Sequence, residues 1–388
     1  MIRVGIAGVG AAGRAFVPAI LAHPAFALAA IADPSAAIRQ EMQRAYQVPA
    51  HPDFAALLAN GAIDAVCIAT PTEMHAEQAI AALAAGKHVL LEKPMATTMA
   101  DADAILAAAR SAGKLLLVGH SHSYDAPIAR MRQLVESGVV GAPCMANTWC
   151  YTDWVYRPRR PEELDVAKGG GVTFRQGAHQ FDILRFLCGG LAQSVRAKTF
   201  DLDPARSTIG AHVAFVDFAD GAAGTAVYSG YDHLPGALLT FGIGEWGFPQ
   251  PAKAAPAARA VSPDEELREK AERARHAIPA QAPHPPFFGL TVLSCARGDI
   301  RQVPEGLAVH TRNGVTTIPV SSARSPRDVL LDELHEAIAG IRPPVHDGRW
   351  ALASLELCLG ASESARSGRE VVLTRQVPLA RPVGPIAA

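Results

Sequence analysis

Residues 2–13 read Ile2-Arg3-Val4-Gly5-Ile6-Ala7-Gly8-Val9-Gly10-Ala11-Ala12-Gly13, an apolar run that ends in a Gly-x-Gly-x-x-Gly turn. The part up to Gly8 has the composition of a buried strand and 11–22 that of a helix, so the glycines fall between a strand and a helix. Gly8 permits the tight turn, Gly10 leaves room for a pyrophosphate, and Gly13 lets the helix pack on the strand. The stretch therefore predicts a βαβ unit that binds a dinucleotide.

A second apolar run, 26–32, ends in Asp33, about twenty residues beyond Gly13. A carboxylate at this point can accept hydrogen bonds from both hydroxyls of the adenosine ribose, and it would repel a 2′-phosphate. We therefore expect NAD as the cofactor in preference to NADP. The alternative is a glycine turn without a nucleotide, in which Asp33 caps a helix before Pro34.

The composition is typical of a soluble enzyme. At 388 residues the chain is long enough for two domains, each with its own core. The formal net charge is −1 and no run is rich in lysine and arginine, so nucleic acid is not expected as a partner. The first residues lead directly into a strand, without a basic leader, a twin-arginine signal or an apolar run of membrane-spanning length. We therefore expect a cytoplasmic protein with no membrane partner.

The six cysteines are scattered along the chain and show no Cys-x-x-Cys spacing. This distribution predicts reduced, mostly buried thiols, and it suggests neither a disulfide framework nor a structural zinc site. The positions are Cys67, Cys144, Cys150, Cys188, Cys295 and Cys358.

Apolar runs alternate with helical patterns through the first third of the chain. Strands are predicted at 64–70, 88–91 and 115–119, with helices at 73–85 and 99–112 between them. This alternation is typical of a doubly wound parallel sheet.

After His120 the pattern changes to longer segments with alternating apolar residues. Residues 212–218 and 224–228 are separated by the turn residues Asp220-Gly221, which predicts an antiparallel hairpin. We therefore place the domain boundary near His122.

The predicted fold class is α/β with two domains. Residues 1–122 form an N-terminal NAD-binding Rossmann domain with a doubly wound parallel sheet. Residues 123–388 form a C-terminal α+β domain for substrate binding and oligomerisation, with an open, largely antiparallel sheet. A final helix, at about 347–367, is expected to pack back toward the first domain.

A Pro/Ala-rich insertion at 246–286 contains one charged helix. Its start, Ser262-Pro263-Asp264-Glu265, has an N-cap serine and a capping-box glutamate, and Glu266 and Lys270 are spaced for an i,i+4 ion pair. The apolar seam of this helix is thin, which favours a solvated surface arm. A subunit contact or a cover over the site is the alternative.

A second motif, Glu92-Lys93-Pro94, follows the predicted strand at 88–91. Together with the glycine turn and Ala69-Thr70-Pro71-Thr72-Glu73-Met74-His75, it resembles the Gfo/Idh/MocA oxidoreductase family over nearly the whole chain. The resemblance implies that Lys93 lies beside the nicotinamide and serves catalysis. A lysine close to a positively charged ring has a physical reason for a lowered pKa, which suits proton transfer. The implied cofactor-binding residues are Gly8, Gly10, Ala12, Gly13, Asp33, Thr70, Pro71, His75, Glu92 and Lys93.

The family's second signature, a glycine run followed by Asp-x-Gly-x-His, is matched in part by residues 169–182. His179 stands at the family's catalytic histidine, but Arg175 stands where a carboxylate is usual. On one continuous helix Arg175, His179 and Asp182 would share a face. Arg175 offers a fork for a substrate carboxylate, His179 a titratable imidazole, and Asp182 an acceptor that could orient this imidazole.

Residues 119–127, 153–159 and 174–182 look like the branch of the family that includes dehydrogenases of aromatic cis-dihydrodiols such as that of phthalate. An aromatic and basic loop at 149–160 suits a flat, anionic ring through stacking and bidentate pairing; an exposed connector is the alternative. The candidate substrate-binding residues are Arg175, Asp182, His120, His122, Tyr124, Trp154, Tyr156 and Arg157.

His120 and His122 form a His-x-His pair at a strand end, a pattern that can bind a metal with His179 and Asp182. A nicotinamide dehydrogenase of this type needs no metal, and imidazoles at this place can bind substrate hydroxyls. We therefore expect no metal.

The sequence thus predicts an NAD-dependent dehydrogenase that oxidises a cis-dihydrodiol of an aromatic carboxylate to the catechol, with hydride transfer to nicotinamide C4. Either Lys93 or His179 takes the hydroxyl proton. The alternatives are a dehydrogenase of a sugar, inositol or sugar acid, and an NAD-binding sensor or scaffold without catalysis. By analogy with the family, we expect a homodimer or homotetramer formed through the free face of the second sheet.

Overall fold

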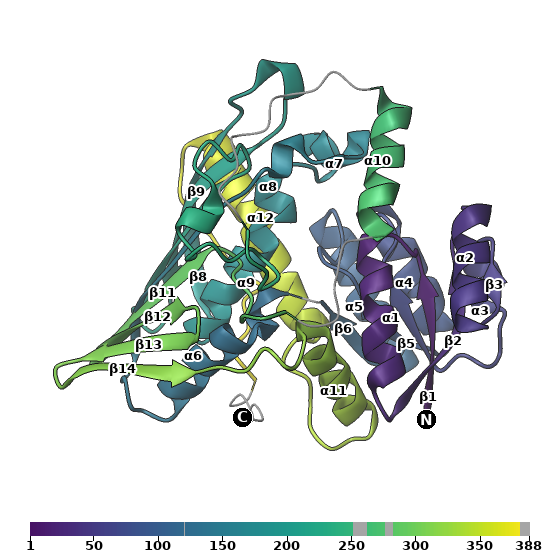
Figure 1. The fold of residues 1–388 in the computed structure, drawn as a ribbon, viewed down its shortest axis with the longest axis horizontal. Helices are drawn as coiled ribbons and strands as arrows, with labels where there is room; N and C mark the ends of the chain where they lie inside the picture. The colour runs from purple at the N-terminus through teal and green to yellow at the C-terminus, as the bar shows by residue number, and fades with distance from the viewer. Residues whose placement is uncertain (120, 251–261, 276–281, 381–388) are drawn as a thin grey trace. The chain divides into compact units, whose positions relative to one another are not determined.

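The computed structural model describes residues 1–119, 121–250, 262–275 and 282–380. These residues form two compact units, which are drawn in Figure 1. The first unit contains the N-terminal sheet, the end of helix α10 (Pro263–Arg275) and Arg327–Leu352, and the second unit contains the rest. His120, one of the predicted substrate contacts, lies outside the described residues.

The first unit is built on a six-stranded parallel sheet with the strand order β3-β2-β1-β4-β5-β6. Its inner strands are continuous apolar runs, as expected when helices cover both faces of a parallel sheet. The predicted doubly wound Rossmann fold is confirmed. The strands are β1 (Ile2–Ala7), β2 (Phe26–Ala32), β3 (Ala50–His51), β4 (Ala65–Ile68), β5 (His88–Leu91) and β6 (Leu116–Val118). The helices are α1 (Ala11–Ala22), α2 (Ala36–Tyr46), α3 (Phe54–Leu58), α4 (His75–Ala84), α5 (Met99–Ala112) and α11 (Pro326–Ile338).

The strand order reverses between β1 and β4, because the chain runs outward from β1 on one side and from β4 on the other. In open α/β sheets a crevice forms at this switch point, at the carboxyl ends of the strands. The glycine turn follows β1, the turn at Thr70 follows β4, and the turn at Lys93 follows β5. Three of the predicted motifs therefore lie at one edge of one sheet.

The second unit is built on a nine-stranded sheet with the strand order β14-β13-β12-β11-β7-β10-β9-β8-β15. All neighbours are antiparallel except β7 and β10, and the predicted hairpin is the pair β9 and β10, with Asp217 opposite Ala223. The predicted largely antiparallel second sheet is thus confirmed. The strands are β7 (Pro143–Tyr151), β8 (Ala192–Phe200), β9 (Ala211–Phe218), β10 (Ala223–Ser229), β11 (Leu290–Cys295), β12 (Gly298–Val303), β13 (Gly306–Thr311), β14 (Gly314–Pro319) and β15 (Val371–Val372).

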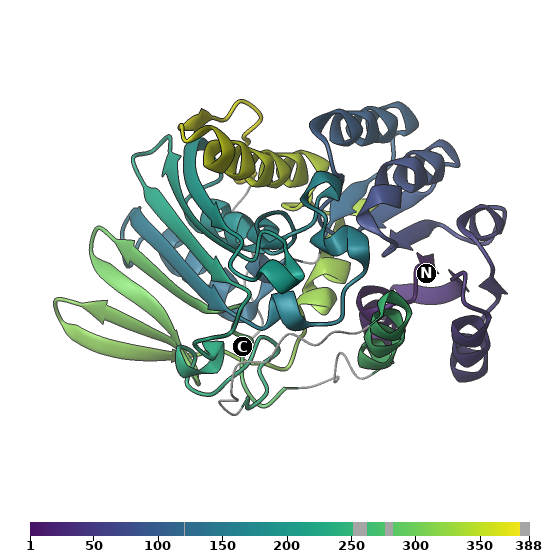
Figure 2. The same ribbon diagram turned by 90° about the horizontal axis from the view of Figure 1, so that it is seen from above.

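Helices line one face of this sheet, as Figure 2 shows. Every residue of α9 (Gly177–Leu187) is buried, because the helix packs on β7 and β10. The other helices of the unit are α6 (Ala126–Glu136), α7 (Pro161–Leu164), α8 (Val172–Arg175) and α12 (Gly348–Ser367), whose first turn belongs to the first unit. Alternate residues of β9, Val213 and Phe215, are exposed, so the other face of the sheet presents apolar side chains.

One sequence-based expectation needs correction here. Arg175, His179 and Asp182 do not lie on one continuous helix, because Gln176 separates α8 from α9 and its φ of −108° departs from helical geometry. Glycine at position 177, where α9 begins, has low helix propensity, which is consistent with a break at this point.

Most residues of the charged helix α10 are exposed, as expected of a surface arm, but ion pairs hold one side of it to the second unit. Glu266 accepts hydrogen bonds from Arg206 and from the backbone N–H of Arg159, and Lys270 pairs with Glu163. The predicted N-cap is confirmed, since the Ser262 hydroxyl accepts a hydrogen bond from the N–H of Glu265 at 3.2 Å. Across the described residues, no helix has the length and apolar character needed to span a membrane.

Candidate active site

The glycine turn has the geometry that a dinucleotide requires. Gly8 has φ of +81°, and a Cβ at this position would lie 2.7 Å from the carbonyl oxygen of Ala69. A Cβ on Gly13 would overlap the carbonyl oxygen of Gly8, whereas a Cβ on Gly10 would meet no atom within 4 Å. Gly10 therefore faces open space at the start of α1, where Ala12 lies in the first turn, and the helix N-terminus favours an anion such as pyrophosphate.

Asp33 lies beside this turn at the end of β2. Its carboxylate accepts hydrogen bonds from the N–H of Val9 at 3.0 Å and from the N–H of Ser35 at 2.9 Å. Arg39 donates from Nη1 to the carbonyl oxygens of Asp33 and Pro34, both at 2.8 Å. The carboxylate is thus fixed next to the glycine turn, and the guanidinium of Arg39 lies on the main-chain oxygens of this segment.

His75 connects the turns that follow β4 and β5. Its ring is buried, with Nδ1 at 2.9 Å from the carbonyl oxygen of Pro94 and Nε2 at 3.0 Å from that of Thr70. The Thr70 hydroxyl donates to Gln78 at 2.6 Å, and Pro71 precedes the short helix Thr72–Met74. His75 therefore shapes the crevice by holding these two turns rather than by presenting an open ring.

The Glu92-Lys93-Pro94 segment combines a buried carboxyl with a half-buried lysine. Burial raises the pKa of Glu92, although the nearby Lys93 and Arg327 oppose this shift. The backbone N–H of Lys93 contacts the Glu92 carboxyl at 3.3 Å, and the peptide bond between Lys93 and Pro94 is cis. The segment thus places a cation at the carboxyl end of β5.

The rings of His179, His122 and Phe288 meet in the second unit. His179 lies on α9, and its ring meets that of His122 edge to face at a centroid distance of 4.7 Å. Phe288 stacks on His122 at 4.2 Å and meets the edge of His179 at 4.9 Å. All three side chains are buried, so the His179 ring, the proposed proton acceptor, packs against an imidazole and a phenyl ring.

His122, in the short helix His122–Tyr124, has a carboxylate at each ring nitrogen. Nδ1 lies 2.8 Å from Oδ2 of Asp125, and Nε2 lies 3.5 Å from Oε1 of Glu245, which is long for a hydrogen bond but close for an ion pair. Burial alone would lower the pKa of His122, but the two carboxylates outweigh it and raise this pKa to about 9. The ring is therefore a cation at neutral pH.

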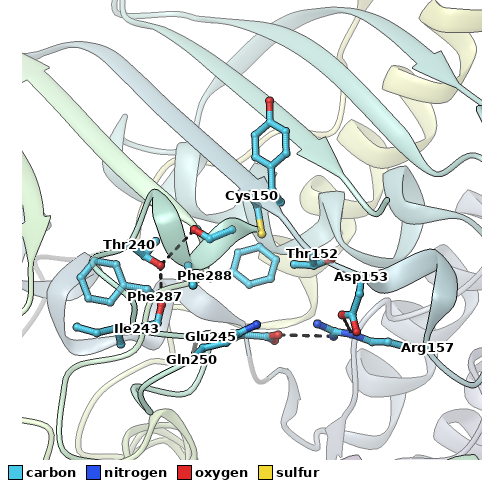
Figure 3. Close-up of a pocket in the computed structure, with 15 residues that line it drawn as sticks. Cys150, Thr152, Asp153, Arg157, Thr240, Ile243, Glu245, Gln250, Phe287 and Phe288 are labelled. Atoms are coloured by element: carbon cyan, nitrogen blue, oxygen red, sulfur yellow. Dashed lines mark hydrogen bonds and ion pairs between the residues drawn. The ribbon is translucent and has the colours of Figure 1, made fainter. Parts of the chain in front are cut away.

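Glu245 also connects His122 to a small, largely polar cavity of about 40 Å³, whose lining is shown in Figure 3. In this cavity Nη1 of Arg157 lies 3.8 Å from Oε2 of Glu245, and Nε of Arg157 donates to Asp153 at 2.5 Å. Burial opposes the charge of Arg157, but both carboxylates favour it and raise its pKa. Asp153, Arg157, Glu245, His122 and Asp125 thus form a chain of alternating charges.

Asp182 is the centre of a separate group of hydrogen bonds. It accepts from the hydroxyl of Ser123 at 2.5 Å and from that of Ser354 at 3.2 Å. The fully buried Arg185 donates to the same Ser354 hydroxyl at 2.9 Å. Asp182 therefore joins α9 to the segment around His122 and to α12.

The side chains of the remaining predicted substrate contacts interact with other residues of the protein. Arg175 is half-buried and donates from Nε to the carbonyl oxygen of Gly169 at 3.0 Å. Trp154 is buried, with the guanidinium of Arg159 over its ring at 4.2 Å. Tyr156 meets the edge of the Tyr231 ring at 6.3 Å, and Tyr124 is buried. One face of the Trp154 ring is thus covered, and this ring is poorly placed to stack on a substrate.

Sequence reasoning did not select Asp125, Glu245 or Phe288. Asp125 lies three residues after His122, a spacing that could have marked it as an ion-pair partner. Glu245 and Phe288 lie at the two edges of the insertion, where no periodic pattern marks them. Within the described parts of the chain, no group of three or more His, Cys, Asp or Glu side chains is arranged to hold a metal ion.

Comparisons with known proteins agree with this geometry. The profile described as "Oxidoreductase family, NAD-binding Rossmann fold" matches residues 2–120, and the "GFO/IDH/MocA C-terminal domain" profile matches residues 128–238. The 1-carboxy-3-chloro-3,4-dihydroxycyclohexa-1,5-diene dehydrogenase of Comamonas testosteroni is 37% identical over 378 residues, which cover 94% of this chain and 95% of that protein.

Two solved structures extend the likeness to the fold. A crystal structure from Bordetella bronchiseptica RB50, provisionally named a dehydrogenase, has a TM-score of 0.85 and 36% identity, and the match covers 96% of this chain and 99% of that one. An Agrobacterium radiobacter oxidoreductase crystallised with NAD+, L-tartaric acid and magnesium has a TM-score of 0.73 at 18% identity, with 96% and 98% covered. The second likeness concerns the fold alone.

Proposed function

Because the chain belongs to the GFO/IDH/MocA family of NAD-dependent oxidoreductases, we propose that it oxidises a cis-dihydrodiol of an aromatic carboxylate, of the phthalate type, to the corresponding catechol. The observation that carries the proposal is the likeness over nearly the full length to a dehydrogenase named for a carboxylated cyclohexadiene diol. Oxidation of one hydroxyl gives a ketone that tautomerises to an aromatic ring, so rearomatisation favours the oxidative direction.

NAD, when bound, accepts the hydride from the carbon that carries the reacting hydroxyl. The residues proposed to hold it are the glycines of the turn with Ala12, the carboxylate of Asp33, and the turns at Thr70-Pro71 and Glu92-Lys93. Their fit rests on the open space at Gly10, the helix start at Ala11 and the fixed carboxylate of Asp33. His75 contributes by holding the two turns together.

His179 is the proposed acceptor of the hydroxyl proton. A neutral imidazole can remove this proton as the C–H bond breaks, and Lys93 is the second candidate for the same role. The apolar surroundings supplied by Phe288 exclude water from the His179 ring and suit a flat, unsaturated substrate ring. Arg175 is the proposed partner of the substrate carboxylate, since its planar fork matches a carboxylate in two-point pairing.

We also propose that the protein is a homo-oligomer, a dimer or tetramer, assembled through the open face of the nine-stranded sheet. Exposed apolar side chains on β9 support this proposal.

A substrate screen tests the proposed function. NADH absorbance would be followed with the cis-dihydrodiols of benzoate, phthalate and isophthalate, beside myo-inositol and glucose. We expect turnover of at least one carboxylated dihydrodiol and little turnover of the polyols. Oxidation of the polyols alone would contradict the dihydrodiol assignment and favour the sugar or inositol alternative.

Two variants test the proton acceptor. Lys93→Met and His179→Ala are each expected to lower kcat by about 10²- to 10⁴-fold, the usual contribution of a positioned acid or base. The NAD affinity should change much less. Near-normal turnover in either variant would remove that residue from the proton-transfer step.

A further inference from the structure

We propose that Arg14 is a positioning residue for NAD: its guanidinium, held by Glu41, fixes the peptide group between Val9 and Gly10 in the orientation that the pyrophosphate requires. The inference rests on the proposed placement of NAD at the glycine turn, and it does not depend on the identity of the substrate. A residue outside the glycine motif would thus contribute to the affinity for the cofactor.

Arg14 contacts the glycine turn through its backbone and through its side chain. It lies near the start of α1, where its N–H donates to the carbonyl oxygen of Gly10 at 2.9 Å and closes the first helical turn. Its side chain turns back, and Nε donates to the carbonyl oxygen of Val9 at 3.1 Å. The N–H of Val9 donates to the Asp33 carboxylate at 3.0 Å. Val9 is therefore held at both of its backbone polar groups.

Holding the Val9 carbonyl also directs the N–H of Gly10. The two groups belong to one planar trans peptide, in which the N–H points away from the C=O. Gly10 is the N-cap of α1, and N–H groups at the start of a helix are the groups that bind a pyrophosphate. A rotated peptide would turn its carbonyl oxygen, which carries a partial negative charge, toward the phosphates. The bond from Arg14 opposes this rotation.

Glu41 on α2 fixes the guanidinium that makes this contact. Nη1 and Nη2 of Arg14 donate to the two carboxylate oxygens of Glu41, the second at 2.9 Å. These bonds raise the pKa of Arg14 and lower that of Glu41, so both groups are charged at neutral pH. With Nε on Val9 and both terminal nitrogens on Glu41, three bonds set the plane of the guanidinium. This arrangement suits a side chain that holds a backbone group better than one that binds a phosphate directly.

Cofactor binding to the full chain, measured by isothermal titration calorimetry, tests the proposal. Arg14→Ala should raise the dissociation constant for NAD about tenfold, as expected for the loss of one charge-assisted hydrogen bond. ADP-ribose, which carries the pyrophosphate, should lose affinity by the same factor, whereas adenosine, which lacks it, should lose little. Arg14→Lys restores the charge but not the three bonds of the guanidinium, so it should recover only part of the loss.

Glu41 should act only through Arg14. Glu41→Gln keeps the size of the side chain and should raise the dissociation constant for NAD about two- to fivefold. In the Arg14→Ala background the same change should have no further effect, as expected of residues that share one interaction. A second measurement needs no cofactor: hydrogen exchange over residues 7–14 of the free protein should be faster in Arg14→Ala than in the parent.

The matched control is Arg3→Ala. It removes a guanidinium that pairs with Asp64 at the start of β1, through Nε at 2.9 Å and Nη2 at 2.8 Å. It should leave the NAD affinity and the exchange over residues 7–14 unchanged. Losses of NAD affinity as large as those in Arg14→Ala would indicate a general effect on the fold and would overturn the proposal.

Full recovery in Arg14→Lys would mean that Arg14 acts by its charge alone, and the positioning role would be wrong. A parent protein that does not bind NAD would overturn both this proposal and the proposed function. The binding measurements do not depend on turnover. If the shifts in affinity occur but no dihydrodiol is oxidised, the role of Arg14 stands and the proposed function fails.

Discussion

Asp33 and Arg39 place opposite charges at the carboxyl end of β2, and we expect their balance to set the cofactor preference. The Asp33 carboxylate is held beside the glycine turn, while the Arg39 guanidinium lies on the carbonyl oxygens of Asp33 and Pro34. In the parent protein the carboxylate should repel a 2′-phosphate. Asp33→Ser removes this repulsion and leaves Arg39 in place, so the preference for NAD over NADP should narrow by about tenfold or more. Fluorescence titration with NAD and NADP measures this preference. Equal affinities of the parent protein for NAD and NADP would show that Asp33 does not discriminate between a free and a phosphorylated ribose.

Arg175 is the proposed partner of the substrate carboxylate, so the effect of replacing it should depend on the substrate. If its guanidinium pairs with the ring carboxylate away from water, Arg175→Ala should weaken productive binding of that substrate by about 2–5 kcal/mol. Arg175→Lys should rescue only part of this loss, because an ammonium lacks the two-point fork.

The comparison that isolates this interaction uses a second substrate. Values of kcat/KM for a carboxylated dihydrodiol and for one without the carboxylate, in parent and variant, form a double-mutant type of cycle. Equal losses on both substrates would mean that Arg175 supports the fold, through its hydrogen bond to Gly169, and not the substrate.

At the scale of elements, His212 joins strand β9 to the helices on the inner face of the sheet. Its buried ring contacts the Thr173 hydroxyl at 3.2 Å and the Gln180 side chain at 3.0 Å. Burial lowers the pKa of His212 from 6.5 to about 3. Between these pH values the unfolded chain protonates this histidine, whereas the folded protein keeps it neutral. Folding free energy is therefore lost progressively as the pH falls from 6.5 toward 3.

This linkage predicts that the free energy of unfolding depends less on pH in His212→Asn than in the parent protein. Between pH 7.5 and pH 5.0 the parent should lose about 2 kcal/mol of unfolding free energy through this histidine alone, and the variant should lack that part of the loss. Urea unfolding at both pH values measures the difference. His233→Asn, which removes an exposed histidine, is the control and should keep the slope of the parent. An unchanged slope in His212→Asn would mean that His212 is not kept neutral in the folded protein.

Helix α10 is fixed to the second unit by Glu266. The side chains of Glu266 and Arg206 are only 12% and 14% exposed, and Glu266 also accepts the backbone N–H of Arg159 at 2.7 Å. Glu266→Gln leaves the guanidinium without its charged partner and should lower the free energy of unfolding by about 1–3 kcal/mol in urea. The matched variant Glu272→Gln removes an exposed partner of Arg275 and should cost less than about 0.5 kcal/mol. Equal effects would contradict the docked position of α10.

The elements that could be predicted from the sequence are those with local signals. The glycine spacing and the alternation of apolar runs with helical patterns are local, and they were sufficient for the parallel sheet and for the hairpin of β9 and β10. The break at Gln176 was missed because the i,i+4 spacing of Arg175 and His179 outweighed the glycine that follows. The docking of α10 was missed because Arg206 and Glu163 lie far from Glu266 and Lys270 along the chain.

The same limit applies to the candidate site as a whole. His122 and His179 were selected because they stand in recognisable motifs. Glu245 and Phe288, which contact these imidazoles, come from a segment without periodicity. Only the folded chain brings Glu245 to His122 and Phe288 to His179. The sequence therefore marks candidate residues through their motifs, but it does not predict the neighbours that set the protonation and packing of these residues.

At the scale of the whole molecule, we expect subunits to associate through the open face of the nine-stranded sheet. Phe215 and Val213 are 43% and 46% exposed on this face, and large exposed apolar side chains in a sheet are typical of subunit contacts. Phe215→Asp would bury a charge in such a contact and should shift the protein from an oligomer toward the monomer at micromolar concentration. Sedimentation velocity measures the change. Ile341→Asp alters an equally apolar residue, 65% exposed and in the first unit, and should leave the mass unchanged. A monomeric parent, or an oligomer that survives Phe215→Asp, would mean that this face does not join subunits.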